Sequence, residues 1–446
     1  MTNVDFRAYK RIVQYFYDPE PKNVDGLTSP IWCLGQRYSL DQKPSALNTI
    51  HTPPQDSRKA NMTHEYAHAA TTPESIASSF DSSLTCDEPT ARNGEDGGWP
   101  AAFLDDFEAK LWFSYRSNFP AIPKSQDPKA ASAMTFSARL RNYSDRDGFT
   151  SDTGFGCMIR SGQSLLANSI LTLRLGRVWR RGQSKHAEME ILSLFADDPA
   201  APFSIHRFVQ HGASACGKYP GEWFGPSATA RCIQELTDSY KSSDIKVYLT
   251  GDGSDVYVDS LMGISKADGE RFMPTLILVG TRLGIDKITP AYYEALAATL
   301  KMPQSIGIAG GRPSASHYFL GVQGDNFFYL DPHYTKSALP LRADVDDYTD
   351  AEVSSCHTRR LRLVNVQQMD PSMLIGFLIR DEEDWHDWRR NVTSAQGKAI
   401  IHIADTDPAS LNTSGEREGA IDEVESFDGD DDDEDEDETV LDRQTF

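Results

Sequence analysis

The spacing of apolar residues divides the central part of this chain into helical and extended segments. From Cys157 onwards, Ile159, Leu166, Ile170 and Leu173 fall on one face at helical spacing, so the sequence predicts a helix over 157–175. Comparable patterns predict helices over 103–116, 226–240 and 290–301. Strand-like runs occur at 245–249, 274–280, 305–309, 316–322, 326–331 and 373–380. Helices and strands are interspersed along the sequence, which indicates an α+β protein.

Polar segments interrupt this pattern and set the expected domain boundaries. Residues 42–101 are rich in Ser, Thr, Pro, Asn and Ala and contain few large apolar side chains. Burial of these few side chains cannot offset the conformational entropy that the segment would lose on folding. We therefore expect a disordered insert at 42–101 and a surface loop at 124–148. The other divisions are an N-terminal arm at 1–28, one domain formed by 29–41 and 102–391, and a disordered acidic tail at 392–446.

The acidic charge is concentrated at one end of the chain. The 446 residues carry a net charge of −22, and the fourteen acidic residues and one arginine of 421–446 account for −13 of it. The first 420 residues therefore carry only −9, and they contain no basic stripe of the kind that binds nucleic acid. We expect no nucleic-acid partner, and we expect charge repulsion to keep the tail extended.

Cysteine usage and hydropathy favour a cytoplasmic location. The six cysteines form no Cys-x-x-Cys pair and no zinc-type spacing with histidine, so we predict no disulfide framework, no metal and no other cofactor. Cys216, Cys232 and Cys356 could form a regulatory disulfide or be inert, and their spacing does not distinguish these two alternatives. The N-terminus lacks a signal-peptide core, and nowhere do about eighteen apolar residues run together.

Candidate chemistry begins at the motif SDTGFGC, residues 151–157. Gly154 and Gly156 allow a tight turn before Cys157, where the predicted helix starts. The unpaired amides and the positive dipole end of a helix N-terminus favour a thiolate over a thiol. Cys157 is therefore a candidate nucleophile. The alternative is a small apolar residue that fills space at a helix start.

A second motif, DPH at residues 331–333, closes the predicted strand 326–331. Asp331 and His333 are two residues apart, so an extended chain would point both side chains to one face. A thiol nucleophile needs a base and a group that fixes the imidazole tautomer, and these two residues supply both. Alone, Asp-Pro-His is also a common turn. His317 is a competing base, but its alternating strand pattern favours a hydrogen-bonded core histidine.

Together, these motifs resemble the autophagin family of papain-like cysteine proteases. The matching segments, in the family's order, are IWCLG at 31–35, LWFSYRSNFP at 111–120, SDTGFGC at 151–157, GEWFGP at 221–226, RLG at 282–284, MPQS at 302–305, HYF at 317–319, DPH at 331–333 and DPS at 370–372. The resemblance implies a papain-like α+β fold, with the cysteine at a helix N-terminus and the Asp/His pair on an antiparallel sheet. An aspartate two residues before the histidine distinguishes this family from papain itself.

The resemblance also implies a role for each site residue. Cys157 would be the nucleophile, His333 the general acid/base and Asp331 the group that orients the imidazole. Tyr115 would help to hold the oxyanion, although without the resemblance a core aromatic residue whose hydroxyl finds a nearby acceptor is the favoured interpretation. Trp223 would wall the substrate cleft. A loop containing Gly310, Gly311 and Pro313 would form a lid over that cleft.

The reaction implied by the resemblance is hydrolysis after the C-terminal glycine of the ubiquitin-like autophagy modifier. The scissile bond is a peptide in the precursor and an amide to phosphatidylethanolamine in the conjugate, so contact with a membrane surface would be transient. We expect a cytoplasmic enzyme recruited to the site of autophagosome assembly, with a nuclear pool as an alternative. The rival functions are a papain-like deubiquitinase and a non-catalytic adaptor that binds the modifier. The presence of Cys157, Asp331, His333 and Tyr115 together argues against the adaptor.

Overall fold

The computed structural model describes the greater part of the predicted domain. The described residues are 20–23, 29–39, 97–135, 138–139, 148–251, 253–267, 269, 271–311 and 315–408. Most of the predicted arm at 1–28, insert at 42–101 and tail at 392–446 lies outside these residues, as does Pro313 of the predicted lid.

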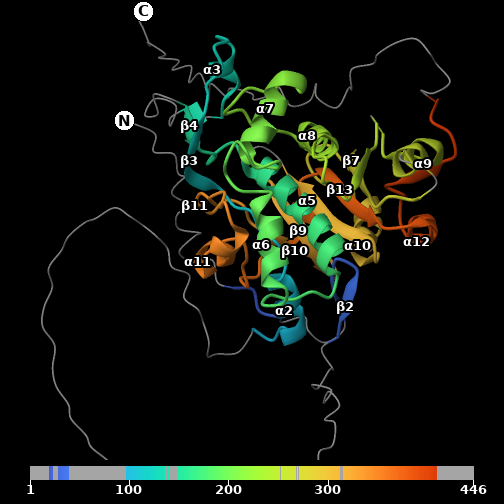
Figure 1. The fold of residues 1–446 in the computed structure, drawn as a ribbon. Helices are drawn as coiled ribbons and strands as arrows, with labels where there is room; N and C mark the ends of the chain where they lie inside the picture. The colour runs from blue at the N-terminus through green and yellow to red at the C-terminus, as the bar shows by residue number, and fades with distance from the viewer. Residues whose placement is uncertain are drawn as a thin grey trace, which may run out of the picture.

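A mainly antiparallel nine-stranded sheet forms the centre of the molecule (Figure 1). Its strand order is β12-β10-β9-β8-β13-β7-β5, and β1 joins β9 to β2. All neighbouring pairs in this sheet are antiparallel except β5 and β7. The strands are β1 (Ile31–Cys33), β2 (Gln36–Tyr38), β5 (Lys246–Leu249), β7 (Thr275–Arg282), β8 (Ser305–Gly310), β9 (His317–Gln323), β10 (Asn326–Leu330), β12 (Leu363–Asn365) and β13 (Ser372–Ile379).

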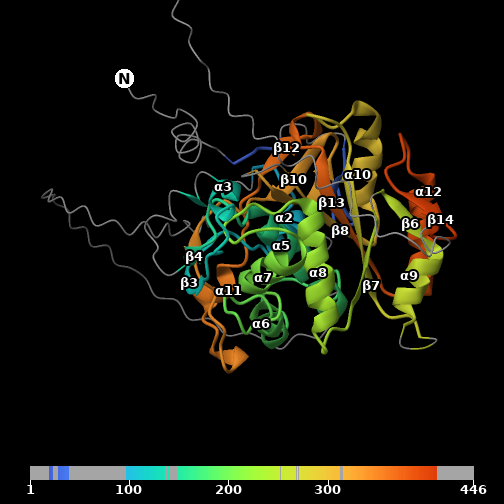
Figure 2. The ribbon, with the colours of Figure 1, turned by 90° about the horizontal axis from the view of Figure 1, so that it is seen from above.

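Both faces of this sheet are buried, because alternate side chains of each central strand enter different cores. On β7, Leu276 and Leu278 join one apolar cluster, whereas Ile277 and Val279 join the other. Figure 2 shows α5 and α8 on the first face and α9, α10 and α12 on the second. These helices are α5 (Cys157–Leu175), α8 (Pro226–Ser239), α9 (Val258–Ser265), α10 (Tyr293–Lys301) and α12 (Glu382–Ser394). None of the described helices is long and apolar enough to cross a bilayer.

Two smaller sheets and several short elements complete the described chain. Strands β11 (Lys336–Ser337), β3 (Arg116–Ile122) and β4 (Phe149–Ser151) form one sheet, and β14 (His402–Ala404) pairs with β6 (Asp255–Tyr257) in the other. The remaining helices are α2 (Ala101–Glu108), α3 (Ala130–Ala133), α6 (Lys185–Ser193), α7 (Ile205–Ala215) and α11 (Asp350–Ser354), with 3-10 turns at Pro290–Tyr292, Val345–Asp347 and Val366–Gln368. The sequence pattern did not identify α6, α7, α9 or α12.

The predicted helix over 103–116 is wrong in its second half. Helix α2 ends at Glu108, and the chain from Leu111 to Phe113 is neither helix nor strand and lies beside α5. Asn168 on α5 accepts a hydrogen bond from the Leu111 amide at 3.0 Å, and the Ser164 hydroxyl accepts one from Phe113 at 3.0 Å. Polar side chains on the neighbouring helix therefore replace the intrahelical hydrogen bonds that the local pattern predicted.

The predicted boundary of the tail at 392 is also wrong, because ordered structure continues beyond it. Helix α12 runs to Ser394, and β14 pairs in parallel with β6. Ile400 and Ile401 are each 6% exposed and belong to the second apolar cluster. This apolar pair attaches the segment to the domain through contacts distant in sequence.

Candidate active site

The turn before α5 places Cys157 at the first position of that helix. Gly154 has a φ of +97°, which a side-chain-bearing residue rarely adopts. The amides of Phe155 and Gly156 donate to the Asp152 carbonyl at 3.1 and 2.8 Å. A Cβ on Gly156 would lie 2.4 Å from Asp152 Oδ2. Gly154 is therefore required by its backbone conformation, and Gly156 by the lack of space for a side chain beside Asp152.

A buried ionic network holds this turn in place. Asp152 Oδ1 accepts a hydrogen bond from the Arg116 amide at 2.7 Å, and Asp152 Oδ2 pairs with Arg160 Nε at 2.7 Å. Arg160 Nη1 also pairs with Asp197 at 2.7 Å. Sequence reasoning missed this network, because its three charged side chains come from three separate segments.

Asp331 and His333 lie in a turn directly after β10, not on an extended strand as predicted. Asp331 Oδ1 accepts hydrogen bonds from the His333 amide at 3.0 Å and from His333 Nδ1 at 2.6 Å. The Trp112 indole donates to the Asp331 carbonyl at 2.9 Å, and the Tyr115 amide donates to the Pro332 carbonyl at 2.8 Å. The carboxylate thus fixes both the turn and the imidazole, and the 112–115 segment holds the turn.

The side chains of Cys157 and His333 influence each other strongly. Burial, the largest single influence, would raise the pKa of the fully buried Cys157 thiol, but His333, the Ser316 backbone and Trp223 together lower the pKa below its ordinary value. Burial would lower the pKa of His333, but the Asp331 hydrogen bond and the charge on Cys157 raise it to about 10. His333 Nε2 is buried and makes no aligned hydrogen bond to other described residues. Because Nδ1 is hydrogen-bonded to Asp331, Nε2 is the ring nitrogen that can exchange a proton with the Cys157 sulfur.

Tyr115 and Trp223 complete the surroundings of the sulfur. The Tyr115 ring packs edge-on against His333 at 5.4 Å, and burial and the nearby Cys157 raise the pKa of its hydroxyl. The hydroxyl therefore stays protonated as a donor. The Trp223 indole nitrogen is buried without a hydrogen-bond partner among the described residues. It and the Ser316 backbone help to lower the pKa of the Cys157 thiol.

His317 lies close to both Asp331 and His333. Its Nε2 is 3.9 Å from Asp331 Oδ1, and its ring is 5.4 Å from that of His333. Burial lowers the pKa of His317 to about 4, which keeps its imidazole neutral at physiological pH. The His317 imidazole lacks a short hydrogen bond to Asp331 such as His333 makes at 2.6 Å, and its low pKa makes it the poorer base. The geometry therefore favours His333 as the general base.

The glycines of the predicted lid differ in their surroundings. Gly310 is the last residue of β8 and pairs with both Met373 and His317, so it is part of the sheet. Gly311 follows it and donates to the Ser372 carbonyl at 3.1 Å. The predicted loop therefore starts after Gly310, and its next residues lie outside those described.

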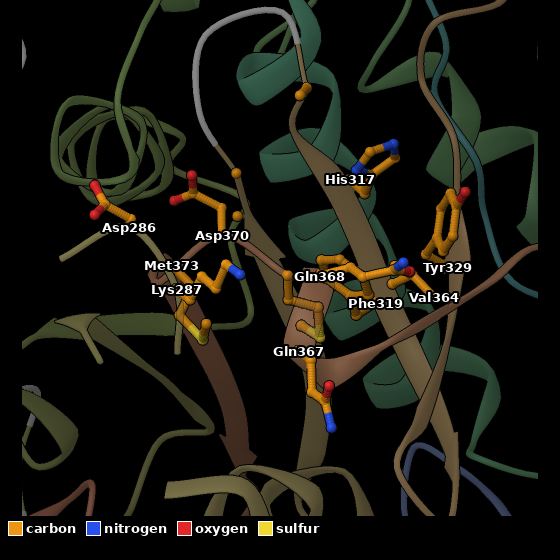
Figure 3. A pocket seen from close by; sticks show the side chains of 14 residues that line it. Asp286, Lys287, His317, Phe319, Tyr329, Val364, Gln367, Gln368, Asp370 and Met373 are labelled. Atoms are coloured by element: carbon orange, nitrogen blue, oxygen red, sulfur yellow. The ribbon is translucent and has the colours of Figure 1, made fainter. Parts of the chain in front are cut away.

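A cavity of about 350 Å³ adjoins this end of the sheet (Figure 3). Its lining combines aromatic and polar side chains and includes His317, Phe319, Tyr329, Lys287 and Asp370. Because His317 also contacts Asp331, this cavity lies next to the catalytic turn.

Residues 100–391 match the Peptidase C54 catalytic domain. This chain belongs to the Peptidase C54 family. The match begins at the residue before α2 and ends within α12, so it includes every site residue named above. The papain-like α+β fold predicted from the resemblance is confirmed.

Relatives similar along most of their length support this Peptidase C54 membership. The "Probable cysteine protease atg4" of Botryotinia fuckeliana is 62% identical over 447 residues, which cover 99% of this chain and 100% of the relative. The "Cysteine protease 1" of Neurospora crassa is 53% identical, with 95% and 90% covered. The "Cysteine protease ATG4" of Pyricularia oryzae is 51% identical, with 98% and 97% covered. The resemblance to autophagins is confirmed, and the chain is a cysteine protease of autophagy.

Proposed function

We propose that this Peptidase C54 protease cleaves after the C-terminal glycine of the ubiquitin-like autophagy modifier. One observation carries the catalytic assignment: Cys157, buried at the first position of α5, interacts with a histidine whose Nδ1 is held 2.6 Å from Asp331 Oδ1. In the proposal Cys157 is the nucleophile, His333 the general acid/base and Asp331 the orienting group. Tyr115 and the Cys157 amide stabilise the oxyanion.

The reaction proceeds through a thioester. The Cys157 thiolate attacks the glycine carbonyl carbon, and the oxygen of the tetrahedral intermediate accepts hydrogen bonds from the Tyr115 hydroxyl and the Cys157 amide. His333 then gives its Nε2 proton to the leaving amine as the C–N bond breaks. In the second half, His333 takes a proton from water, whose oxygen attacks the thioester. The thiolate leaves, and the modifier is released with a free glycine carboxylate.

The requirement for glycine follows from the narrowness of the approach to the sulfur. Cys157 is 0% exposed, and Trp223, at 7% exposure, lies against it. A glycine backbone carries no Cβ that would collide with the indole. We assign Trp223 as the wall of this cleft, and the cavity beside His317 as the place where substrate residues preceding the glycine dock.

Both the precursor and the phosphatidylethanolamine conjugate present the same acyl group, so one site serves maturation and delipidation. The leaving amine differs, but the attack on glycine does not. We therefore propose that the enzyme works in the cytoplasm and at the site of autophagosome assembly, where it contacts the membrane through the conjugate.

A substrate panel tests this proposal. The full chain is incubated with modifier precursor, with ubiquitin carrying the same C-terminal extension, and with the conjugate on phosphatidylethanolamine vesicles. We expect cleavage of the first and third substrates and none of the second, with Cys157→Ala as the inactive control that still binds modifier. Precursor whose terminal glycine is replaced by alanine should resist cleavage. Cleavage of ubiquitin in preference to the modifier would instead establish a deubiquitinase.

A further inference from the structure

A second group of reactive side chains lies away from the catalytic residues. His211 and Cys216 lie on and at the end of α7, and Cys232 lies on α8. A ring nitrogen of His211 and the two sulfurs all lie within 4.8 Å of one another. The sequence spacing gave no zinc pattern, because the donors come from two helices that meet only in the fold.

The packing of α7 against α8 points both sulfurs into the same space. Cys216 Sγ lies 4.0 Å from the carbonyl of Ala228 on α8, and Cys232 Sγ lies 3.6 Å from the carbonyl of Phe208 on α7. Each thiol therefore faces the opposite helix. Cys232 is 0% exposed and Cys216 is 9% exposed, whereas His211 is half-buried, so the group is most accessible on the side of the imidazole.

We propose that His211, Cys216 and Cys232 bind a thiophilic divalent cation of the zinc class. Zinc takes thiolate and imidazole ligands at about 2.3 and 2.0 Å in tetrahedral geometry, which places two sulfurs ~3.8 Å apart. Donors within 4.8 Å of one another need to contract only by about 1 Å to reach this arrangement. Binding releases the thiol protons, and the fourth position is left to water or another ligand.

The third donor distinguishes this site from a disulfide pair. A disulfide would require the sulfurs to approach to about 2.05 Å and would leave His211 without a role. A cavity of about 450 Å³, lined by His211, Gln210 and Glu235 among others, opens beside the imidazole. This cavity supplies the solvent path that a bound cation needs.

The position of the site links it to the catalytic cleft. Trp223 lies in the chain segment between Cys216 and Cys232, and its indole lies next to the Cys157 thiol. A cation held by both cysteines fixes the two ends of this segment and restrains the tryptophan. This effect on the cleft rests on the proposed function, whereas cation binding itself does not.

Cobalt(II) binding to the full-length Cys157→Ala protein tests the site without the catalytic thiol. We expect about one equivalent to bind with a near-ultraviolet sulfur-to-cobalt band, and zinc to displace it. Cys216→Ser and Cys232→Ala should each weaken binding at least ~10-fold and diminish the band, and His211→Ala should weaken binding while keeping the band. Cys33→Ala, which alters a buried cysteine outside the group, should bind as the parent does. His317, Asp331 and His333 also form a possible cation site, but they have no sulfur and cannot give this band.

Hydrogen exchange provides the second measurement. Zinc at ten times its Kd should slow opening of residues 217–225 about tenfold in the Cys157→Ala protein, and this protection should be lost in the Cys216→Ser variant. Absence of the sulfur-to-cobalt band would overturn the proposal, as would a band that survives both cysteine substitutions. Oxidation of Cys216 and Cys232 to a disulfide in a protein that takes up no cation would also overturn it. None of these outcomes depends on cleavage of the modifier, so the proposed function is tested separately.

Discussion

Cys33 and Cys157 are both 0% exposed, yet their thiols are shifted in opposite directions. Burial, aided by the nearby Asp106 carboxylate, raises the pKa of Cys33 to about 12. Burial acts in the same sense on Cys157, but His333, the Ser316 backbone and Trp223 reverse it. Depth in the fold therefore does not decide which cysteine is a nucleophile; the polar groups directed at the sulfur decide it.

The two cysteines differ in whether a nearby positive charge is available to interact with the sulfur. Near Cys33, the Asp106 carboxylate pairs with Lys110 at 2.9 Å and with Arg177 at 2.8 Å, so these cations are engaged with a carboxylate. Near Cys157, Asp331 binds only one nitrogen of His333 in the contacts described, and the imidazole also interacts with the Cys157 sulfur, whose pKa it lowers. A cation that is paired with a carboxylate can still stabilise a thiolate if one of its donor groups is not engaged by that carboxylate.

Substitution of the two cysteines gives the largest expected contrast. Cys157→Ala should lower kcat by roughly 10⁵-fold or more, because it removes the nucleophile. Cys33→Ala should leave kcat/KM within about twofold, because its thiol takes no part in the reaction and lies in the core. Single-turnover cleavage of modifier precursor measures both variants. Comparable losses in the two proteins would contradict the distinction between the sites.

Removal of the orienting charge is the next largest effect. Asp331→Asn should lower kcat about 10³- to 10⁴-fold, because the imidazole loses both its tautomer control and its stabilising charge. The carboxylate of Asp331 raises the pKa of His333, so the substitution should also lower that pKa. A pH profile of the residual activity measures the shift.

The pH dependence of the parent enzyme follows from the same pair. Activity should rise as Cys157 ionises, below the ordinary thiol value of 9.0, and fall as His333 deprotonates near pH 10. Because the folded pKa of His333 exceeds its ordinary value of 6.5, its stabilising contribution is complete below pH 6.5 and is lost as the pH rises through about 10. In Asp331→Asn the alkaline limb should move to lower pH. An unchanged alkaline limb would show that Asp331 does not control the imidazole.

Loss of the tyrosine hydroxyl should have an intermediate effect. Tyr115→Phe removes one oxyanion donor and should lower kcat about 10²- to 10³-fold with little change in KM. The ring contact with His333 is preserved in this variant, so the pH profile should keep its shape. A loss confined to KM would identify Tyr115 as a substrate-binding residue instead.

Gly156→Ala should show itself chiefly as a loss of stability of the turn that presents Cys157. Its Cβ would lie 2.4 Å from the Asp152 carboxylate, which Arg160 holds in place. We expect urea unfolding to show a loss of about 1–3 kcal/mol. Gly263→Ala on α9 is the matched control, because its Cβ would meet nothing within 4 Å, and it should stabilise the helix by up to about 1 kcal/mol. Equal stabilities for the two variants would contradict the role of the Gly156 turn.

Local signals predicted the elements that carry the catalytic groups. The helix over 157–175 has the predicted bounds, and the strands β8, β9, β10 and β13 lie within a residue or so of the predicted runs. The apolar content of these elements is high because both faces of the sheet are buried and α5 is buried on all sides from Cys157 to Leu171. The glycines before Cys157 likewise identified the turn, since Gly154 has a positive φ and a side chain on Gly156 would collide with Asp152.

Contacts between distant segments decided what the sequence could not. The 111–113 segment is not helical, and Asn168 and Ser164 hydrogen-bond to it from α5. Residues 400–404 are ordered because β14 pairs with β6 and because Ile400 and Ile401 pack in the second apolar cluster. The sequence by itself determined the chemical groups, the helix that bears the thiol and the strand that leads to the histidine. Only the tertiary structure decided which buried sulfur meets an oriented imidazole and which sulfurs meet one another, because these electrostatic environments are formed by side chains far apart in the chain.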